Sequence, residues 1–189
     1  LIGYTLFSWL ATISTLVHNF TGPLFAVAVP VLIVLFVRDN LPKAYDLQWL
    51  AKFGGMLDRS GAMHLPSGKF NAGEKVQFWL MVCLLSVVLI GTGLILDFPN
   101  FGQTRATMQL ANVIHMIAAM LAIVMAVAHI YLGTIGMRGA YEAMRYGYVD
   151  EAWAKEHHDY WYHDVVAGKV DRGAAPSAGT AAEPRGVTA

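Results

Sequence analysis

Two histidines in one apolar stretch are the residues of this chain best suited to chemistry. His115 and His129 lie fourteen residues apart in segment 110–132, which contains no Lys, Arg, Asp or Glu. Fourteen residues at 3.6 per turn are within about 40° of four full turns, so both imidazoles share one helix face, roughly 21 Å apart along the axis. That distance is most of the hydrocarbon thickness of a bilayer. A membrane-crossing helix of this kind could form a shared wall for two stacked haems.

A third histidine, His18, lies in another apolar stretch. A low-spin b-type haem takes two axial nitrogen ligands on opposite sides of its plane, and imidazole is a suitable ligand for iron. His18 and His115 can supply both ligands from two helices. The alternative is a pair of intramembrane histidines that hydrogen-bond to backbone or line a proton path. Gly22, one turn after His18, either leaves room for a flat macrocycle or serves close helix packing.

The composition predicts an all-α integral membrane protein, a bundle of transmembrane helices surrounded by membrane lipid. Hydrophobic residues make up 56% of the chain and charged residues only 14%, whereas soluble domains carry about 25% charged residues. The formal net charge is zero, and the basic residues are distributed along the chain, so we expect no nucleic-acid partner. The single cysteine, Cys83, excludes a disulfide framework or a sulfur cluster of the chain's own.

Three membrane spans are predicted, at about 14–37, 76–96 and 107–135. Residues 1–37 contain no charged side chain; as one helix they would reach about 55 Å, so this segment must bend or begin outside the hydrocarbon core. We expect residues 1–13 to lie along the interface and residues 14–37 to cross. A cytoplasmic helical extension is predicted at 136–172, and a flexible tail rich in small residues at 173–189.

The basic residues predict the orientation. Six of them lie in connection 38–75, one in connection 97–106 and six more after residue 136. The long connection and the C-terminus are therefore expected in the cytoplasm. The first and third spans would then run inward and the second outward. This topology places His18 and His115 at similar depth near the outer face and His129 near the inner face.

Several motifs together resemble one family of respiratory proteins. The chain is similar to the gamma subunit of respiratory formate dehydrogenase, its cytochrome b membrane subunit, within a group that includes hydrogenase and thiosulfate-reductase cytochromes. The resemblance covers most of residues 1–163. It rests on HNFTG at 18–22, FVRDN at 36–40, NAGEK at 71–75, IH at 114–115, HIY at 129–131, WAKEHH at 153–158 and WY at 161–162.

The resemblance implies four spans and two haem b groups. Its outer haem would be held by His18 and His115, and its inner haem by His129 with a histidine from a preceding first span. That span is absent from the sequence, so we expect an N-terminal helix to be missing from it. The other histidines, His64, His157, His158 and His163, fall in predicted cytoplasmic segments. The pair His157 and His158 is expected on the surface or at a subunit contact, in a short helix that begins near Asp150.

The resemblance also implies a quinone site close to the inner haem, at Asn71, Ala72 and Gly73. Physically, the Asn71 side chain can hydrogen-bond a quinone oxygen, and Gly73 lets the backbone approach the ring. The alternative is a helix start, because Asn71 with Glu74 three residues later forms a variant of the capping box. Both roles are compatible.

The function implied by the resemblance is electron transfer across the bacterial cytoplasmic (inner) membrane. A molybdenum or tungsten subunit would oxidise formate, and an iron-sulfur subunit on the outer face would pass the electrons to the two b haems. Quinone would be reduced near Asn71 with protons from the cytoplasm, so this chain would be the quinone-reducing subunit of an oxidoreductase complex. One alternative is the cytochrome b subunit of a hydrogenase or another molybdoenzyme. A second, of another class, is a haem-free membrane anchor or proton-conducting helix bundle.

Overall fold

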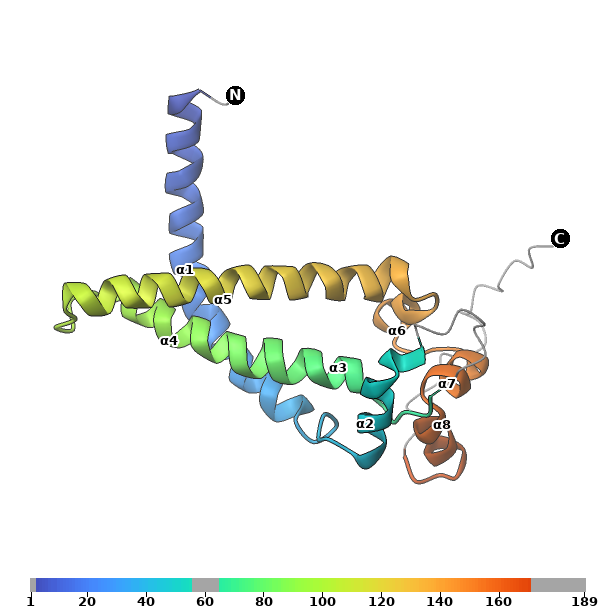
Figure 1. Ribbon diagram of the computed structural model, residues 1–189. Helices are drawn as coiled ribbons and strands as arrows, with labels where there is room; N and C mark the ends of the chain where they lie inside the picture. The colour runs from blue at the N-terminus through green and yellow to red at the C-terminus, as the bar shows by residue number, and fades with distance from the viewer. Residues whose placement is uncertain (1–2, 56–64, 171–189) are drawn as a thin grey trace.

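The computed structural model describes residues 3–55 and 65–170 of the 189-residue chain, and within these ranges every regular element is a helix (Figure 1). Three continuous helical stretches are long and apolar enough to cross a membrane, Tyr4–Phe36, Ala72–Asp97 and Arg105–Gly136. The predicted all-α membrane fold with three spans is therefore confirmed.

The first span, α1 (Tyr4–Phe36), is one helix of 33 residues that contains Pro23 and Pro30. Figure 1 shows that its N-terminal part stands away from the other helices and that α1 changes direction where it passes α5. The expected bend is present, but helix already begins at Tyr4, ten residues before the predicted start at 14. Threonine hydroxyls in this part donate to backbone carbonyls four residues earlier, as Thr12 does to Ser8 at 2.9 Å. Such bonds satisfy polar groups within the helix.

The second span is built from α3 (Ala72–Gln77), a π-helical segment η2 (Phe78–Leu85) and α4 (Ser86–Asp97). It begins four residues before the predicted position 76, because a capping box at Asn71 starts the helix there. In the middle of the span, the Ser86 hydroxyl donates to the Met81 carbonyl five residues earlier, at 2.9 Å. The Ser86 hydroxyl is thus bonded inside the span.

The third span is α5 (Arg105–Tyr131), which continues into the π-helical segment η3 (Leu132–Gly136). Thr104 starts it, since its hydroxyl oxygen accepts a hydrogen bond from the Thr107 amide at 3.2 Å. The helix is continuous through both His115 and His129, so the axial separation of roughly 21 Å between these residues holds. α5 packs on α4, and α4 also packs on α1.

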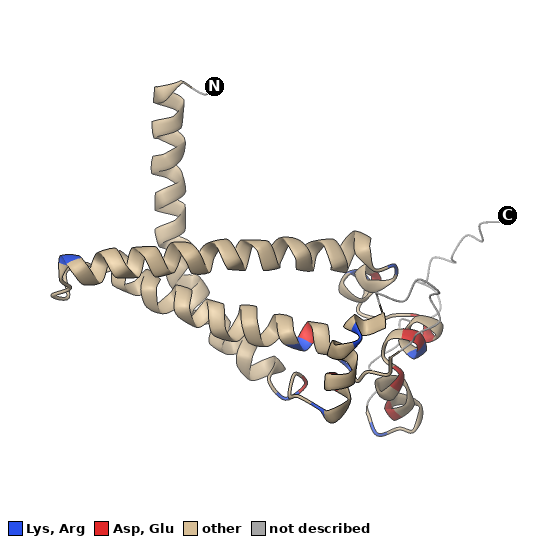
Figure 2. Cartoon of the chain, viewed as in Figure 1, with Lys and Arg blue, Asp and Glu red and all other residues tan. Residues whose placement is uncertain are grey.

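The remaining helices gather at one end of the spans, here called the charged end. They are α2 (Ala44–Ala51), a short 3-10 turn (Phe53–Gly55), α6 (Ala140–Tyr146), α7 (Glu151–His157) and α8 (Asp159–Val166). Figure 2 shows that most charged residues of the described part of the chain lie at this end. The opposite end, which carries the connection from α4 to α5, is called the far end.

The helices alternate in direction between these two ends. In Figure 1, α5 and the second part of α1 run toward the charged end, whereas the span from α3 to α4 runs toward the far end. α7 begins where the sequence predicts, because the Asp150 carboxylate accepts a hydrogen bond from the Trp153 amide at 2.7 Å. The alternation leaves His18 and His115 on helices that run the same way.

Candidate functional site

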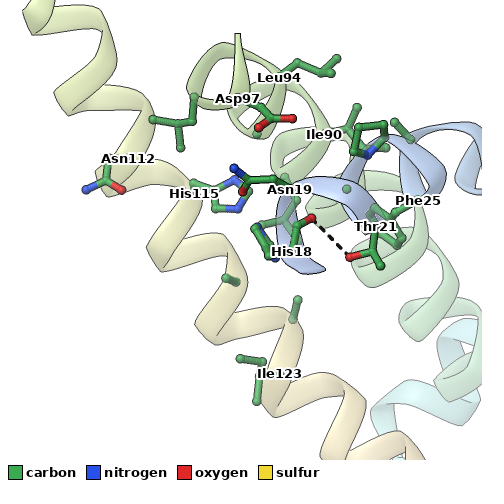
Figure 3. Close-up of a pocket in the computed structure, with 18 residues that line it drawn as sticks. His18, Asn19, Thr21, Phe25, Ile90, Leu94, Asp97, Asn112, His115 and Ile123 are labelled. Atoms are coloured by element: carbon green, nitrogen blue, oxygen red, sulfur yellow. Dashed lines mark hydrogen bonds between the residues drawn. The ribbon is translucent and has the colours of Figure 1, made fainter. Parts of the chain in front are cut away.

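The structure brings His18 of α1 and His115 of α5 together. Their ring centroids are 6.0 Å apart and their planes are inclined at 81°. Figure 3 shows the two side chains next to each other between the helices. Two imidazoles on opposite sides of one metal ion, with metal–nitrogen bonds of about 2 Å each, have centroids about 6 Å apart. The spacing of this pair therefore fits two axial ligands of one metal ion.

A cavity of about 630 Å³ surrounds this pair between α1, α4 and α5. Its walls are mostly apolar, with contributions from Leu94 and Ala119, and Asp97 lines it where α4 ends. Gly22 also lines the cavity, and no atom lies within 4 Å of the position that a Cβ would take there. Gly22 thus faces open space and not a tightly packed helix. An apolar cavity with two converging imidazoles and a glycine wall fits a flat, mostly hydrophobic macrocycle such as haem.

The Thr92 hydroxyl of α4 contacts the His115 ring. Its hydroxyl lies 2.7 Å from the Val88 carbonyl, which can only accept a hydrogen bond, and 2.8 Å from Nδ1 of His115. When the hydroxyl donates to Val88, its oxygen accepts from His115, and Nδ1 carries the ring proton. The other nitrogen, Nε2, then holds the free lone pair that a metal ion requires. Ligand histidines are commonly oriented by such a bond on the second nitrogen.

A glycine next to Thr92 lets α4 approach this histidine. A Cβ at Gly93 would lie 3.3 Å from Cε1 of His115, closer than an ordinary contact. The sequence Gly91, Thr92, Gly93 thus gives the hydroxyl access to the ring without a bulky neighbour on either side. Thr92 and Gly93 together hold His115 in one orientation.

His129 lies elsewhere on α5, toward the charged end. Its side chain is exposed, and the Glu74 carboxylate of α3 is within its electrostatic reach. Among the described residues, no other histidine ring is in contact with it. Of the three histidines predicted as haem ligands, the structure therefore brings two together and leaves the third at a separate position.

The segment predicted as a quinone site forms the start of α3. The Asn71 side chain accepts a hydrogen bond from the Glu74 amide at 3.0 Å, and the Glu74 carboxylate accepts one from the Asn71 amide at 2.7 Å. Ala72 is buried, and a Cβ at Gly73 would lie 2.9 Å from the ring of Trp49. The capping box is confirmed. The close approach at Gly73 is made to Trp49, and contact with quinone stays a prediction.

A buried ion pair lies next to this helix start. Nζ of Lys75 is 2.7 Å and 3.0 Å from the two carboxylate oxygens of Asp46, and the two side chains are only 6% and 9% exposed. The Lys75 ammonium also lies 5.1 Å from the ring centroid of Tyr45. Burial, together with the Asp46 charge, raises the pKa of the Tyr45 phenol above its ordinary value. The pair ties α2 to the first turn of α3.

The comparison with known proteins assigns the family. Residues 1–147 match the family model of prokaryotic cytochrome b561. The chain belongs to this family. Membership in a cytochrome b family implies haem b, which is the cofactor that the cavity at His18 and His115 fits.

Relatives within this cytochrome family carry more specific names. The chain is 31% identical over 159 residues to the nitrate-inducible formate dehydrogenase cytochrome b556(Fdn) subunit of Escherichia coli K12, covering 83% of this chain and 72% of the relative. It is 28% identical over 173 residues to the formate dehydrogenase cytochrome b556 subunit of Haemophilus influenzae, covering 87% and 72%. The cytochrome b556(fdo) subunit of E. coli K12 is 28% identical over 167 residues, covering 84% and 77%.

Two residues of this cytochrome b561 family member were not predicted from the sequence. Thr92 stands in an apolar span, where threonine ordinarily bonds back to its own helix, and its type alone does not indicate contact with a histidine. His158 was expected on the surface or at a subunit contact with His157, and for His158 this is wrong. It is only 5% exposed, and its Nδ1 lies 2.8 Å from the Gly68 carbonyl. His64 lies outside the described residues.

Proposed function

We propose that this chain is the membrane cytochrome b subunit of a formate dehydrogenase complex, carrying electrons from an iron-sulfur subunit to membrane quinone. The observation that carries the proposal is the meeting of His18 and His115 in an apolar cavity of a cytochrome b561 family member. The names of its relatives in E. coli and H. influenzae support formate as the electron source of the complex. Nothing in the chain itself is assigned to formate.

Bound haem b supplies an iron centre that takes up and releases one electron at a time. The chain's own part is to hold and shield it. His18 and His115 would be the axial ligands, and the hydrogen bond to Thr92 keeps Nε2 of His115 available for iron. The mostly apolar side chains of α1, α4 and α5 that line the cavity would shield the group from water.

A second haem b is proposed at His129. This histidine lies roughly 21 Å along α5 from His115, a separation that puts the two ligands near opposite ends of one span. The second axial ligand of this haem would come from outside the described residues. Two redox centres along one span would carry electrons across the apolar core, from the far end to the charged end.

Quinone is proposed to bind near Asn71, Ala72 and Gly73. Two observations support this position: α3 starts at the charged end, and Glu74 lies within electrostatic reach of His129. The side-chain amide of Asn71 can donate a hydrogen bond to a quinone oxygen while its own oxygen accepts from the Glu74 amide. Protons for quinone reduction would be taken up from the water at this end.

The charged end is proposed to face the cytoplasm of a bacterial cell, with the protein in the inner membrane. Most basic residues of the described part of the chain lie there, whereas the far end carries Arg105, the first residue of α5. The far end would then face the iron-sulfur subunit and the molybdenum or tungsten catalytic subunit.

Copurification tests this assignment. A complex isolated through this chain from its native membranes should contain an iron-sulfur subunit and a formate-oxidising molybdenum or tungsten subunit. Formate should reduce its haem, seen as the rise of the reduced α-band. Copurification of a hydrogenase, with reduction by hydrogen but not by formate, would replace the donor and leave the haem sites in place. Absence of any haem absorption would favour the haem-free anchor.

A further inference from the structure

Helices α7 and α8 dock on the segment that leads into α3. The Tyr160 amide donates to the Ser67 carbonyl at 3.0 Å, and the Ser67 hydroxyl donates to the His157 carbonyl. Nδ1 of His158 lies 2.8 Å from the Gly68 carbonyl. Ser67 and His158 are only 1% and 5% exposed. Three hydrogen bonds thus join residues about ninety positions apart in the chain.

The His158 ring carries a proton on Nδ1 and is packed between aromatic side chains. A carbonyl can only accept a hydrogen bond, so Nδ1 must carry the proton that it donates to Gly68. The centroid of the Trp153 ring lies 5.2 Å from that of His158. The Trp161 ring meets the His158 ring edge-on, with centroids 6.4 Å apart. Burial lowers the pKa of His158 below its ordinary value, so the ring is neutral at pH 7. His158 is therefore a fixed donor and not a surface group.

The opposite side of the segment is closed by α2. A Cβ at Gly68 would lie 2.6 Å from the Tyr45 hydroxyl, and the ring of Tyr45 lies 5.0 Å from that of Tyr160. Asp46, the next residue of α2, holds Lys75 in the first turn of α3. The backbone between Ser67 and Asn71 is thus confined between α2 and α8, and it continues directly into the capping box at Asn71.

We propose that His158 is a positioning residue for quinone binding: its hydrogen bond to Gly68 holds the backbone that carries Asn71, Ala72 and Gly73 in place. The inference rests on the quinone site of the proposed function. It gives α7 and α8 a role in the membrane reaction, because they fix one wall of the site from outside the spans. A small displacement of Gly68 moves the Asn71 amide three residues later, and a misplaced donor weakens binding of its ligand.

The test uses the intact complex with formate as donor and a soluble quinone analogue as acceptor. His158→Ala should raise the KM for the quinone analogue about tenfold, the factor that corresponds to loss of one buried hydrogen bond. Haem content, and the rate with an electron-accepting dye that reacts at the catalytic subunit, should stay at the wild-type level. His158→Asn, whose amide can still donate to Gly68, should restore most of the affinity. His163→Ala, in the helix that directly follows His158 and with a 63% exposed side chain, is the matched control.

Asn71→Ala distinguishes a failure of the His158 positioning role from a failure of the proposed quinone site. If Asn71→Ala raises the KM for quinone and His158→Ala does not, the positioning role is wrong and the proposed quinone site stands. If neither variant changes the KM, the quinone site itself is wrong, and the inference falls with it. If His158→Ala instead removes haem or lowers dye and quinone rates alike, its role is general folding, and the positioning inference is also overturned.

Discussion

The two histidines of α5 lie in different surroundings. The His115 ring lies against the His18 ring, its Nδ1 contacts the Thr92 hydroxyl, and it lines a mostly apolar cavity. His129 is exposed and lies near a carboxylate, and no other histidine ring of the described residues is in contact with it. The same residue type on the same helix thus lies beside a second histidine in a cavity at one position and, among the described residues, without one at the other.

The two ends of the spans are held together by different kinds of contact. At the far end, three helices enclose a mostly apolar cavity, and the Thr92 hydroxyl supplies the polar contact to His115. At the charged end, the order comes from polar contacts, namely the capping box, the Lys75–Asp46 pair and the His158–Gly68 bond. A site for a large apolar cofactor needs the first kind of surroundings, and a site that exchanges protons with water needs the second.

The largest expected loss of activity is at His129, the exposed histidine of α5. His129→Ala should lower formate-to-quinone activity by at least about 100-fold, because loss of a ligand exceeds the 10–100-fold effect of losing its outer partner. The haem at His18 and His115 should remain and still be reduced by formate. Optical spectra and steady-state rates of the purified complex measure both. Full activity in this variant would remove His129 from the electron path.

The buried ion pair at the charged end is expected to dominate local stability. Lys75→Met should destabilise the protein by about 3–5 kcal/mol, because it leaves the Asp46 carboxylate buried without a counter-charge, with the Lys43 amide as its remaining hydrogen-bond donor. The double variant with Asp46→Leu should recover most of the loss. Thermal unfolding in detergent ranks the variants. Lys69→Met, which removes an exposed pair with Asp39, should cost less than about 1 kcal/mol. Equal effects of the two lysine substitutions would contradict the importance of burial.

Thr92 is expected to have a smaller effect, confined to the far end. Thr92→Val should weaken haem binding at His115 by roughly 10–100-fold, because the ring loses its orienting acceptor. Competition with a haem-scavenging protein measures the affinity. Thr92→Ser should behave like wild type, and Thr12→Val, a back-bonding threonine far from the cavity, is the control. The prediction fails if Thr92→Val and Thr12→Val retain haem equally.

The smallest effect is a pH dependence at α7 and α8. Because burial lowers the folded-state pKa of His158, the unfolded chain binds the proton more readily. Stability is therefore fully present above about pH 6.5 and is lost as the pH falls toward the folded-state value, by at most about 1.4 kcal/mol per pH unit. The protection factors of the amides in residues 150–166, which are exchange rates corrected for their intrinsic pH dependence, should fall between pH 6.5 and 5.5. This fall should be absent in His158→Asn; the same fall in both would exclude His158 as its source.

Local chemistry and hydropathy predicted most of the fold. Charge-free runs of spanning length gave the three spans, and Asn71 and Asp150 marked two helix starts, because a capping residue acts on its own neighbours. The meeting of His18 and His115 followed from equal depth on helices of the same direction. His158 could not be predicted in this way. Its partner is a backbone carbonyl about ninety residues away, and a carbonyl carries no mark in the sequence.

The central claim is that His18 and His115 hold one haem between them. Haem b per chain, measured by the pyridine haemochrome assay on the complex, tests it with His18→Ala, His115→Ala and the double variant. The account predicts that each single variant loses the same one haem and that the double variant loses no more. Additive losses would assign the two histidines to separate haems, and an unchanged haem content in both single variants would contradict the claim.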